Sequence, residues 1–229
     1  MSFKSGVDYA KEFFEEDNSR AYDRLVHLAT LGQDSVWKKK IIKQVPADIL
    51  VLDLACGTGI LSSLLIENNN KVVGLDLTLP YLNVIFEKEI NMDLLNATAE
   101  ILPFADDVFD CIVTSYLPKY TNLTSLINEC HRVLKPRGLI LLHDFTLPKK
   151  SLFKYAWRIY FKLIRYAWRN DIKWKNVFAQ LDIMIKSTDW DQKIVDLLEA
   201  IGFTQIKTNY LTFETSLIVT ATKENEFRQ

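Results

Sequence analysis

The fold of this chain is decided by one stretch, Ile49-Leu50-Val51-Leu52-Asp53-Leu54-Ala55-Cys56-Gly57-Thr58-Gly59. An apolar run broken only by Asp53 is typical of a buried parallel strand. The two glycines after it let the backbone approach a ligand closely at the carboxyl end of that strand. Asp76 lies at the end of the next expected strand, where a carboxylate can accept hydrogen bonds from both hydroxyls of an adenosine ribose. The stretch therefore predicts a binding loop for a nucleoside-containing cofactor.

Strands and helices alternate on both sides of this loop. The expected strands are 49–54, 71–77, 92–97, 109–115 and 139–143. Residues 8–45 are expected to form N-terminal helices, and further helices are expected at 60–67, 79–88 and 123–134. Such alternation indicates right-handed crossovers and a parallel sheet with helices on both faces. After Pro148 the pattern changes to an aromatic and basic segment, a helix at 190–201, and two strands at 203–210 and 215–222 that suggest an antiparallel hairpin. We expect one α/β domain over 1–229, with a helical cap over 1–46 and a helical insertion over 149–189.

Composition excludes several classes of protein. The 229 residues include 28 basic and 29 acidic side chains, which give a net charge of −1, and 48% are hydrophobic. These values are ordinary for a globular domain and do not indicate a generally basic nucleic-acid binder. Three cysteines without a CxxC spacing predict a reducing compartment and no metal site. Because no signal peptide and no apolar run of about 18 residues are found, we expect a cytoplasmic protein.

Three interpretations of the glycine loop compete. A dehydrogenase that binds NAD would have a third glycine at position 62, where this chain has Ser62. A plain strand–helix turn beside an incidental acid is the second alternative. Asp53 just before the loop is typical of methyltransferases that use S-adenosylmethionine, in which it would orient the loop amides and the methionine ammonium. We favour the third interpretation.

Further motifs point to one family. The chain resembles the ubiquinone/menaquinone biosynthesis C-methyltransferases, which have the class I S-adenosylmethionine-dependent fold. The matching segments are Tyr22-Asp23, Gly32, Trp37-Lys38, the loop 53–59, Ala99-Glu100-Ile101-Leu102-Pro103-Phe104, Phe109-Asp110-Cys111-Ile112, Arg132-Val133-Leu134-Lys135-Pro136, Asp144-Phe145-Thr146, Pro148 and Ile201-Gly202-Phe203. The resemblance implies a Rossmann-like seven-stranded sheet of order 3-2-1-4-5-7-6 with its last strand antiparallel.

The resemblance also implies a set of cofactor contacts. Together with the loop, the expected cofactor-binding residues are Asp53, Gly57, Thr58, Gly59, Asp76, Leu77, Thr98, Ala99 and Ser115. Two departures from the family pattern stand out. Thr98 replaces the usual Asn or Asp, so the adenine contact is weaker or made by backbone. Pro118-Lys119 aligns, one residue short, with an Arg-Asn pair of the family, so this chain has no arginine at that place.

The implied reaction is methylation of a ring carbon in a polyprenyl quinol such as demethylmenaquinol. Methyl transfer needs proximity and an electron-rich acceptor, and a general base helps by removing a hydroxyl proton from the ring. The candidate bases are His143 and Asp144, at the carboxyl end of the fifth strand, although each could instead have a structural role. Because adjacent strand residues point to opposite faces, we expect only one of them to meet the substrate. Tyr22 is the expected lid over the pocket, with core packing as its alternative.

Residues 149–175 hold nine basic side chains and one acid, Asp171. Lys154-Tyr155-Ala156-Trp157-Arg158 nearly recurs at 165–169, three helical turns later, which predicts one basic stripe formed by residues 154, 158, 162, 165 and 169. A core-packed helix, a helix on an anionic membrane or over a prenyl tail, and a nucleic-acid surface are the alternatives. The resemblance favours a peripheral membrane contact, and a homodimer is a further expectation. The functional alternatives are N- or O-methylation of another lipid or small molecule, and RNA modification, against which the absence of an Asn-Pro-Pro-Tyr motif counts.

Overall fold

The computed structural model describes residues 19–225. Within them lies a seven-stranded sheet of order β3-β2-β1-β4-β5-β7-β6, which confirms the expected order. The strands are β1 (Leu50–Leu54), β2 (Lys71–Asp76), β3 (Asp93–Asn96), β4 (Phe109–Ser115), β5 (Leu134–Phe145), β6 (Phe203–Leu211) and β7 (Ser216–Lys223). Strand β7 runs antiparallel to both β5 and β6, and the other neighbouring pairs are parallel.

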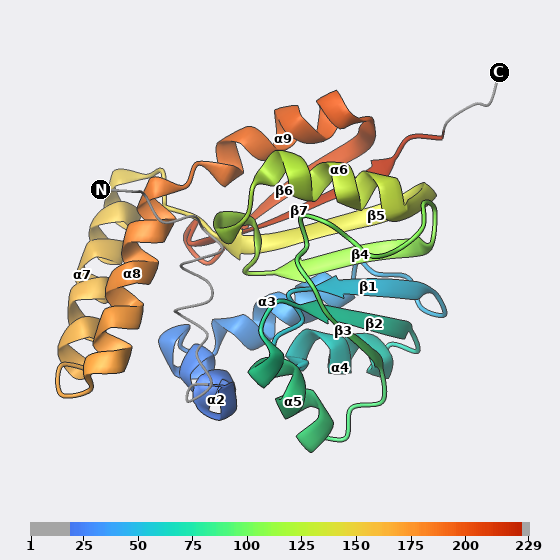
Figure 1. Cartoon of the computed structure of the whole chain (residues 1–229). Coiled ribbons are helices and arrows are strands. Elements are labelled where there is room, and N and C mark those ends of the chain that lie inside the picture. Colours follow the sequence, from blue (N-terminus) through green and yellow to red (C-terminus); the bar gives the residue numbers. More distant parts are fainter. Residues whose placement is uncertain (1–18, 226–229) are drawn as a thin grey trace.

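Helices cover both faces of the sheet (Figure 1). One face carries α3 (Gln33–Ile42), α4 (Ile60–Glu67) and α5 (Leu79–Glu87), and the other carries α6 (Leu123–Val133) and α9 (Trp190–Ile201). The central strands alternate between the two cores. Leu52 and Ile112 pack with the α6 and α9 side, whereas Val51 and Val113 pack with the α3 and α4 side. This burial on both faces explains why β1 and β4 read as apolar runs.

The register aligns the carboxyl ends of the parallel strands at one edge. Leu54 pairs with Leu75 and Thr114, and Ser115 pairs with His143. The loops that follow β1, β2 and β4 therefore lie together, which is where open α/β sheets bind ligands.

The N-terminal helical segment expected over 8–45 is divided into two helices in its described part. Residues 8–18 lie outside the described part, and the rest forms α2 (Ser19–Ala29) and α3. Leu31 and Gly32 separate these two helices with φ values of 51° and 76°. The left-handed conformation suits Gly32, because glycine has no Cβ, and it ends the helical path.

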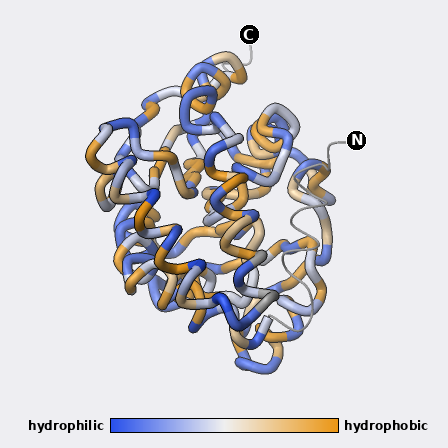
Figure 2. Tube along the Cα trace, turned by 90° about the vertical axis from the view of Figure 1, so that its left-hand side faces the viewer, coloured by the Kyte–Doolittle hydropathy of each residue, from blue (hydrophilic) through white to orange (hydrophobic). Residues whose placement is uncertain are grey.

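Residues 149–175 also do not form one helix. They contribute to a hairpin of α7 (Ser151–Ala167) and α8 (Ile172–Ser187) that stands at the carboxyl end of the sheet (Figure 1). The side chain of Asp171 caps α8 by accepting a hydrogen bond from the Trp174 amide. Arg169 consequently lies in the turn rather than on the α7 stripe. Hydrophobic and hydrophilic positions interleave along the helices on this side of the molecule (Figure 2).

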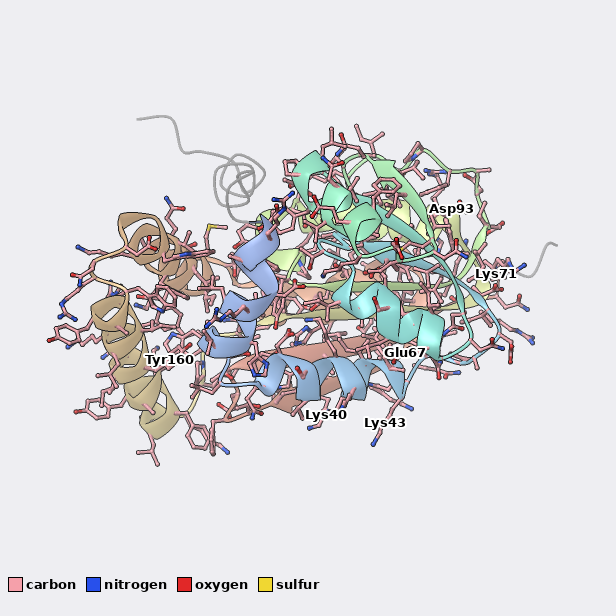
Figure 3. All side chains as sticks on the ribbon, turned by 90° about the horizontal axis from the view of Figure 1, so that it is seen from below. Lys40, Lys43, Glu67, Lys71, Asp93 and Tyr160 are labelled. Atoms are coloured by element: carbon pink, nitrogen blue, oxygen red, sulfur yellow. The ribbon has the colours of Figure 1, made fainter. Side chains whose placement is uncertain are left out.

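Two contacts fix the hairpin to the rest of the fold. At its base, the Trp190 indole donates a hydrogen bond to the Phe145 carbonyl at 2.8 Å, which joins the two ends of the insertion. Along its length, Tyr160 on α7 reaches across to α2, where its hydroxyl donates to the Ala29 carbonyl (Figure 3). Tyr160 therefore joins the hairpin to the N-terminal helix.

Within residues 19–225, the helices are too short or too polar to cross a membrane.

Candidate active site

A first cavity, of about 90 Å³, lies at the carboxyl ends of β1, β2 and β4. It is lined by Tyr22, Ala55, Gly57, Leu75, Asp76, Leu77, Thr78, Tyr81, Ala97, Thr98, Ala99, Ser115, Tyr116, Leu117, Tyr120 and Thr121. Six of the nine expected cofactor residues are among them. The contribution of the loop at 116–121 was not predicted from the sequence. The position of this loop directly after β4 is a signal that could have found it, because open α/β sheets bind ligands at the carboxyl ends of their strands.

Asp76 is the charged group of this cavity. Its two carboxylate oxygens accept hydrogen bonds from the Gly57 and Thr78 amides, both at 2.8 Å. Burial raises the pKa of Asp76, and the backbone amides of Thr78 and Gly57 oppose that rise. Each oxygen keeps a lone pair for a further donor, such as a ribose hydroxyl.

The other three expected cofactor residues lie behind the cavity wall. Asp53 is buried below the loop and accepts a hydrogen bond from the Ser62 hydroxyl at 2.6 Å. Thr58 points the other way, and its hydroxyl donates to Asp23 of α2. Gly59 begins α4 with φ of 80°, and a Cβ there would meet Ile90 at 2.8 Å. These residues shape the loop rather than line the cavity.

The cavity has polar groups that suit a nucleoside. The hydroxyl of Thr121 is buried without a hydrogen-bond partner in the described part of the chain, and Thr121 lines the cavity. A buried polar group of this kind indicates that a ligand or water completes its bonding. With the Asp76 carboxylate and the glycine loop, the donor and acceptor set fits the adenosine part of S-adenosylmethionine.

A second cavity, of about 790 Å³, adjoins the first and is mostly apolar. Helices α2, α7 and α8 contribute most of its wall, with aromatic side chains such as Trp157 and Phe161. Tyr22, Tyr116 and Tyr120 line both cavities. Tyr22 sits at the junction, and its ring meets Tyr81 edge-on at 5.2 Å. A group held in the large cavity would therefore meet one held in the small cavity across these tyrosines.

Both expected bases are fully buried, and neither lines a cavity. The two ring nitrogens of His143 hydrogen-bond to the hydroxyls of Ser115 and Ser216 at 2.8 and 2.7 Å. Burial lowers the pKa of His143 well below its usual value, so the ring is neutral. Because Ser115 lines the cofactor cavity, His143 lies directly behind it.

Asp144 is enclosed by hydrogen-bond donors. One oxygen accepts from the Lys119 ammonium at 2.7 Å and from the Phe145 amide at 2.7 Å, and the other accepts from the Lys119 amide at 3.0 Å. Burial raises the pKa of Asp144, while Lys119 opposes that rise. The geometry thus favours a positioning role for Asp144 and His143 over direct contact with an acceptor, and their part in catalysis stays a prediction.

The sequence is similar to those of known proteins. Residues 3–223 match the model of the ubiE/COQ5 methyltransferase family. The demethylmenaquinone methyltransferase of Chlorobaculum parvum is 31% identical over 212 residues, which cover 88% of each chain. The ubiquinone/menaquinone biosynthesis C-methyltransferase UbiE of Blochmanniella pennsylvanica is 38% identical over 151 residues, 61% of this chain and 58% of that protein.

Solved structures share the fold. Phosphoethanolamine N-methyltransferase 2 of Haemonchus contortus, in complex with S-adenosyl-L-methionine, superposes with a TM-score of 0.69 at 14% identity over 98% of this chain and 61% of that one. A SAM-dependent methyltransferase of Aquifex aeolicus gives 0.61 at 16% identity over 91% and 98%. The fold, the site and the family together define an S-adenosyl-L-methionine-dependent methyltransferase. The chain belongs to the ubiE/COQ5 methyltransferase family, as the resemblance predicted.

Proposed function

We propose that this enzyme methylates a ring carbon of a polyprenyl quinol of the demethylmenaquinol type. The names of its relatives support this acceptor, and one observation carries it. The large apolar cavity opens beside the cofactor cavity, so a flat ring at the junction would have its tail among apolar side chains. Burying a prenyl chain there is favourable by about 25 cal/mol per Å² of apolar surface removed from water.

The mouth of the large cavity supports a lipid acceptor. Leu31, Leu152 and Phe213 line this cavity and are themselves among the most exposed apolar residues, at 78, 73 and 69%. Scattered exposed leucines are ordinary, but a group at the mouth of an apolar cavity marks a route for an apolar ligand. A tail could pass from a bilayer to the cavity without crossing water.

We assign roles to the candidate residues on this basis. Asp76 and the Gly57 loop bind the nucleoside, and Leu77, Thr98, Ala99 and Ser115 complete its wall. Asp53, Thr58 and Gly59 hold the loop in shape. Tyr22 separates the two cavities as a lid, and Asp144 and His143 position the groups in front of them. When bound, S-adenosylmethionine supplies an electrophilic methyl group.

The acceptor is tested by mass spectrometry of quinones from cells that lack this protein. We expect a demethyl quinone to accumulate and to disappear on complementation by the wild-type chain. Complementation by a variant with Asp76→Ala is the matched control, and it should fail because the ribose loses two charge-assisted hydrogen bonds. An unchanged quinone profile, with labelled methyl appearing on a nitrogen or oxygen of another molecule, would favour the alternative acceptors.

We also infer that the protein contacts the cytoplasmic face of an anionic membrane through α7. The outer face of this helix exposes Leu152, Tyr155, Leu163 and Tyr166. Basic side chains flank it, of which Arg158, Lys162 and Arg169 are exposed. An apolar face beside basic residues is the pattern of a helix that lies in the plane of a bilayer interface. A homodimer across the same face, and an RNA contact, are the competing occupants.

A further inference from the structure

One cation stands out in the large cavity. Among the described residues that line it, Lys119 is the one that carries a charge. Its side chain is only 1% exposed and comes from the short 3-10 helix η2 (Pro118–Tyr120) after β4. A charge so deep in an apolar wall is costly unless it is paired, and such groups gather at functional sites.

The surroundings of Lys119 hold its ammonium in place. It donates hydrogen bonds to the Asp144 carboxylate at 2.7 Å and to the Tyr116 carbonyl at 2.9 Å. An ammonium has three N–H groups. In the described part of the chain, the third has no oxygen partner, and the nitrogen lies 4.3 Å from the ring centre of Tyr120, which lines both cavities.

We propose that Lys119 is a catalytic residue that holds a quinol oxygen as an oxyanion, with Asp144 as its positioning residue. The inference rests on the proposed function and names the group that activates the acceptor ring. A phenolic oxygen placed at the cavity junction could accept the remaining N–H of Lys119. Lys119 passes one of its protons to the Asp144 carboxylate and takes the hydroxyl proton in its place, so the ammonium exchanges one counter-charge for another.

The charges balance through the reaction. With its oxygen deprotonated, the ring donates electrons to the carbon beside that oxygen, and this carbon forms the new bond to the methyl group. The electron pair of the broken S–C bond stays on sulfur. The methylated ring is then a neutral dienone, which loses the proton from its new tetrahedral carbon to water. Its oxygen regains the proton stored on Asp144, and one proton is released overall.

The groups around Lys119 agree with this role. Its ionisable neighbours are Asp144 and His143 on β5, Tyr116 before η2 and Tyr120 within it, and Lys38 on α3. The Lys38 ammonium lies 5.1 Å from the centre of the Tyr116 ring. Lys38 is already paired with Asp34. His143 is neutral and the burial of both tyrosines raises their pKa values, so Lys119 and Asp144 are the charged pair at the junction.

The test uses 2-naphthol, a soluble phenol whose neutral and ionised forms absorb differently. The apparent pKa of bound 2-naphthol is titrated in the wild type and in the double variant Lys119→Met, Asp144→Asn. The double variant leaves no unpaired buried charge, so it should fold. We expect its bound naphthol to ionise at least about 1 pH unit higher, which is the usual effect of losing a nearby opposite charge.

Lys223 provides the control, because it is a buried lysine paired with Asp107 at a distance from both cavities. Lys223→Met should leave the pKa of bound naphthol at the wild-type value. Equal pKa values in the wild type and the double variant would overturn the role of Lys119 while leaving the acceptor proposal intact. If 2-naphthol binds to none of the proteins, the proposed quinol site fails, and this inference fails with it.

Discussion

At the scale of single residues, Asp53 shows how the cofactor site affects stability. Burial raises the pKa of Asp53 to about 7, against the opposing hydrogen bond from Ser62. In the unfolded chain the carboxyl releases its proton near pH 3.8. Between these two values the folded state binds more protons, so its stability falls as pH rises.

Asp53→Asn should therefore gain stability relative to the wild type as pH rises from about 4 to about 7. At about 1.36 kcal/mol per pH unit, the difference in unfolding free energy should grow by about 2–3 kcal/mol between about pH 5 and about pH 8. Urea denaturation of both proteins at the two pH values measures it. A difference that stays constant would show that Asp53 is ionised in the folded protein throughout.

The same scale shows what sequence can predict about the site. Asp76 and the glycine loop were predictable, because the ends of consecutive parallel strands meet at one edge of the sheet. The pair of Lys119 and Asp144 was not predictable, because the two residues are 25 positions apart in the sequence. Lysine is also most often a surface residue, and aspartate often caps a loop or a helix. Long-range pairing of this kind depends on register, which an apolar run does not specify.

At the scale of elements, α2 closes the cofactor cavity. Asp23 on α2 accepts hydrogen bonds from Thr58 of the loop and from Lys88 after α5, and Lys88 also donates to the Thr58 carbonyl at 2.9 Å. Ligand pockets usually measure about 300–1,000 Å³, so the cavity of about 90 Å³ is too small for a nucleoside cofactor. We therefore predict that helix α2 moves outward when the cofactor binds.

Asp23→Asn should weaken this closure and raise the dissociation rate of S-adenosylmethionine several-fold. The partly exposed ion pair is worth about 0.5–1 kcal/mol, so the fold should persist. Stopped-flow displacement of the cofactor measures the rate. Arg20→Gln is the matched control, because it breaks the exposed pair between α2 and Glu87 of α5 without touching the loop. Equal rates in both variants would mean that α2 does not gate the cofactor.

The elements themselves were predicted unevenly. Strands β1, β2 and β4 were predicted within a residue or two, because burial on both faces makes them continuous apolar runs. The break at 168–171 was missed, since the repeat of aromatic and basic residues continues across it and outweighs the signal from Asn170-Asp171. Strand β5 begins at Leu134 rather than Leu139 because Leu134 pairs with Phe109, before a register shift that leads to the next pair, Cys111 with Leu139.

At the scale of the whole molecule, Leu152 belongs both to the exposed face of α7 and to the lining of the large cavity. Charge reversal of Arg158, Lys162 and Arg169 to Glu should abolish sedimentation with vesicles that contain anionic lipid. Each basic side chain near such a surface contributes about 1 kcal/mol, so three reversals should weaken binding by at least roughly 100-fold. Methylation of a soluble, short-tailed quinol should continue, because the cavities are unchanged.

The control carries the same change of charge elsewhere. Lys39, Lys40 and Lys43 are exposed on and after α3, where Lys40 and Lys43 point away from the hairpin (Figure 3). Their reversal to Glu should leave vesicle binding intact. Loss of binding in both triple variants would mean that net charge, and not the α7 face, determines vesicle binding. If the wild-type protein does not bind vesicles but doubles its mass in solution, the α7 face contacts a second copy of the chain. If it does not bind vesicles but retards RNA on a gel, this face contacts RNA.

The bond between Trp190 and Phe145 has a consequence for how such an enzyme can diversify. It keeps the two ends of the hairpin side by side, so the position of these ends does not depend on the segment between them. Longer, shorter or differently sequenced hairpins could be exchanged there by evolution or by engineering without disturbing the strand register. The methyl-donor half of the molecule can thus stay constant while the choice of acceptor changes.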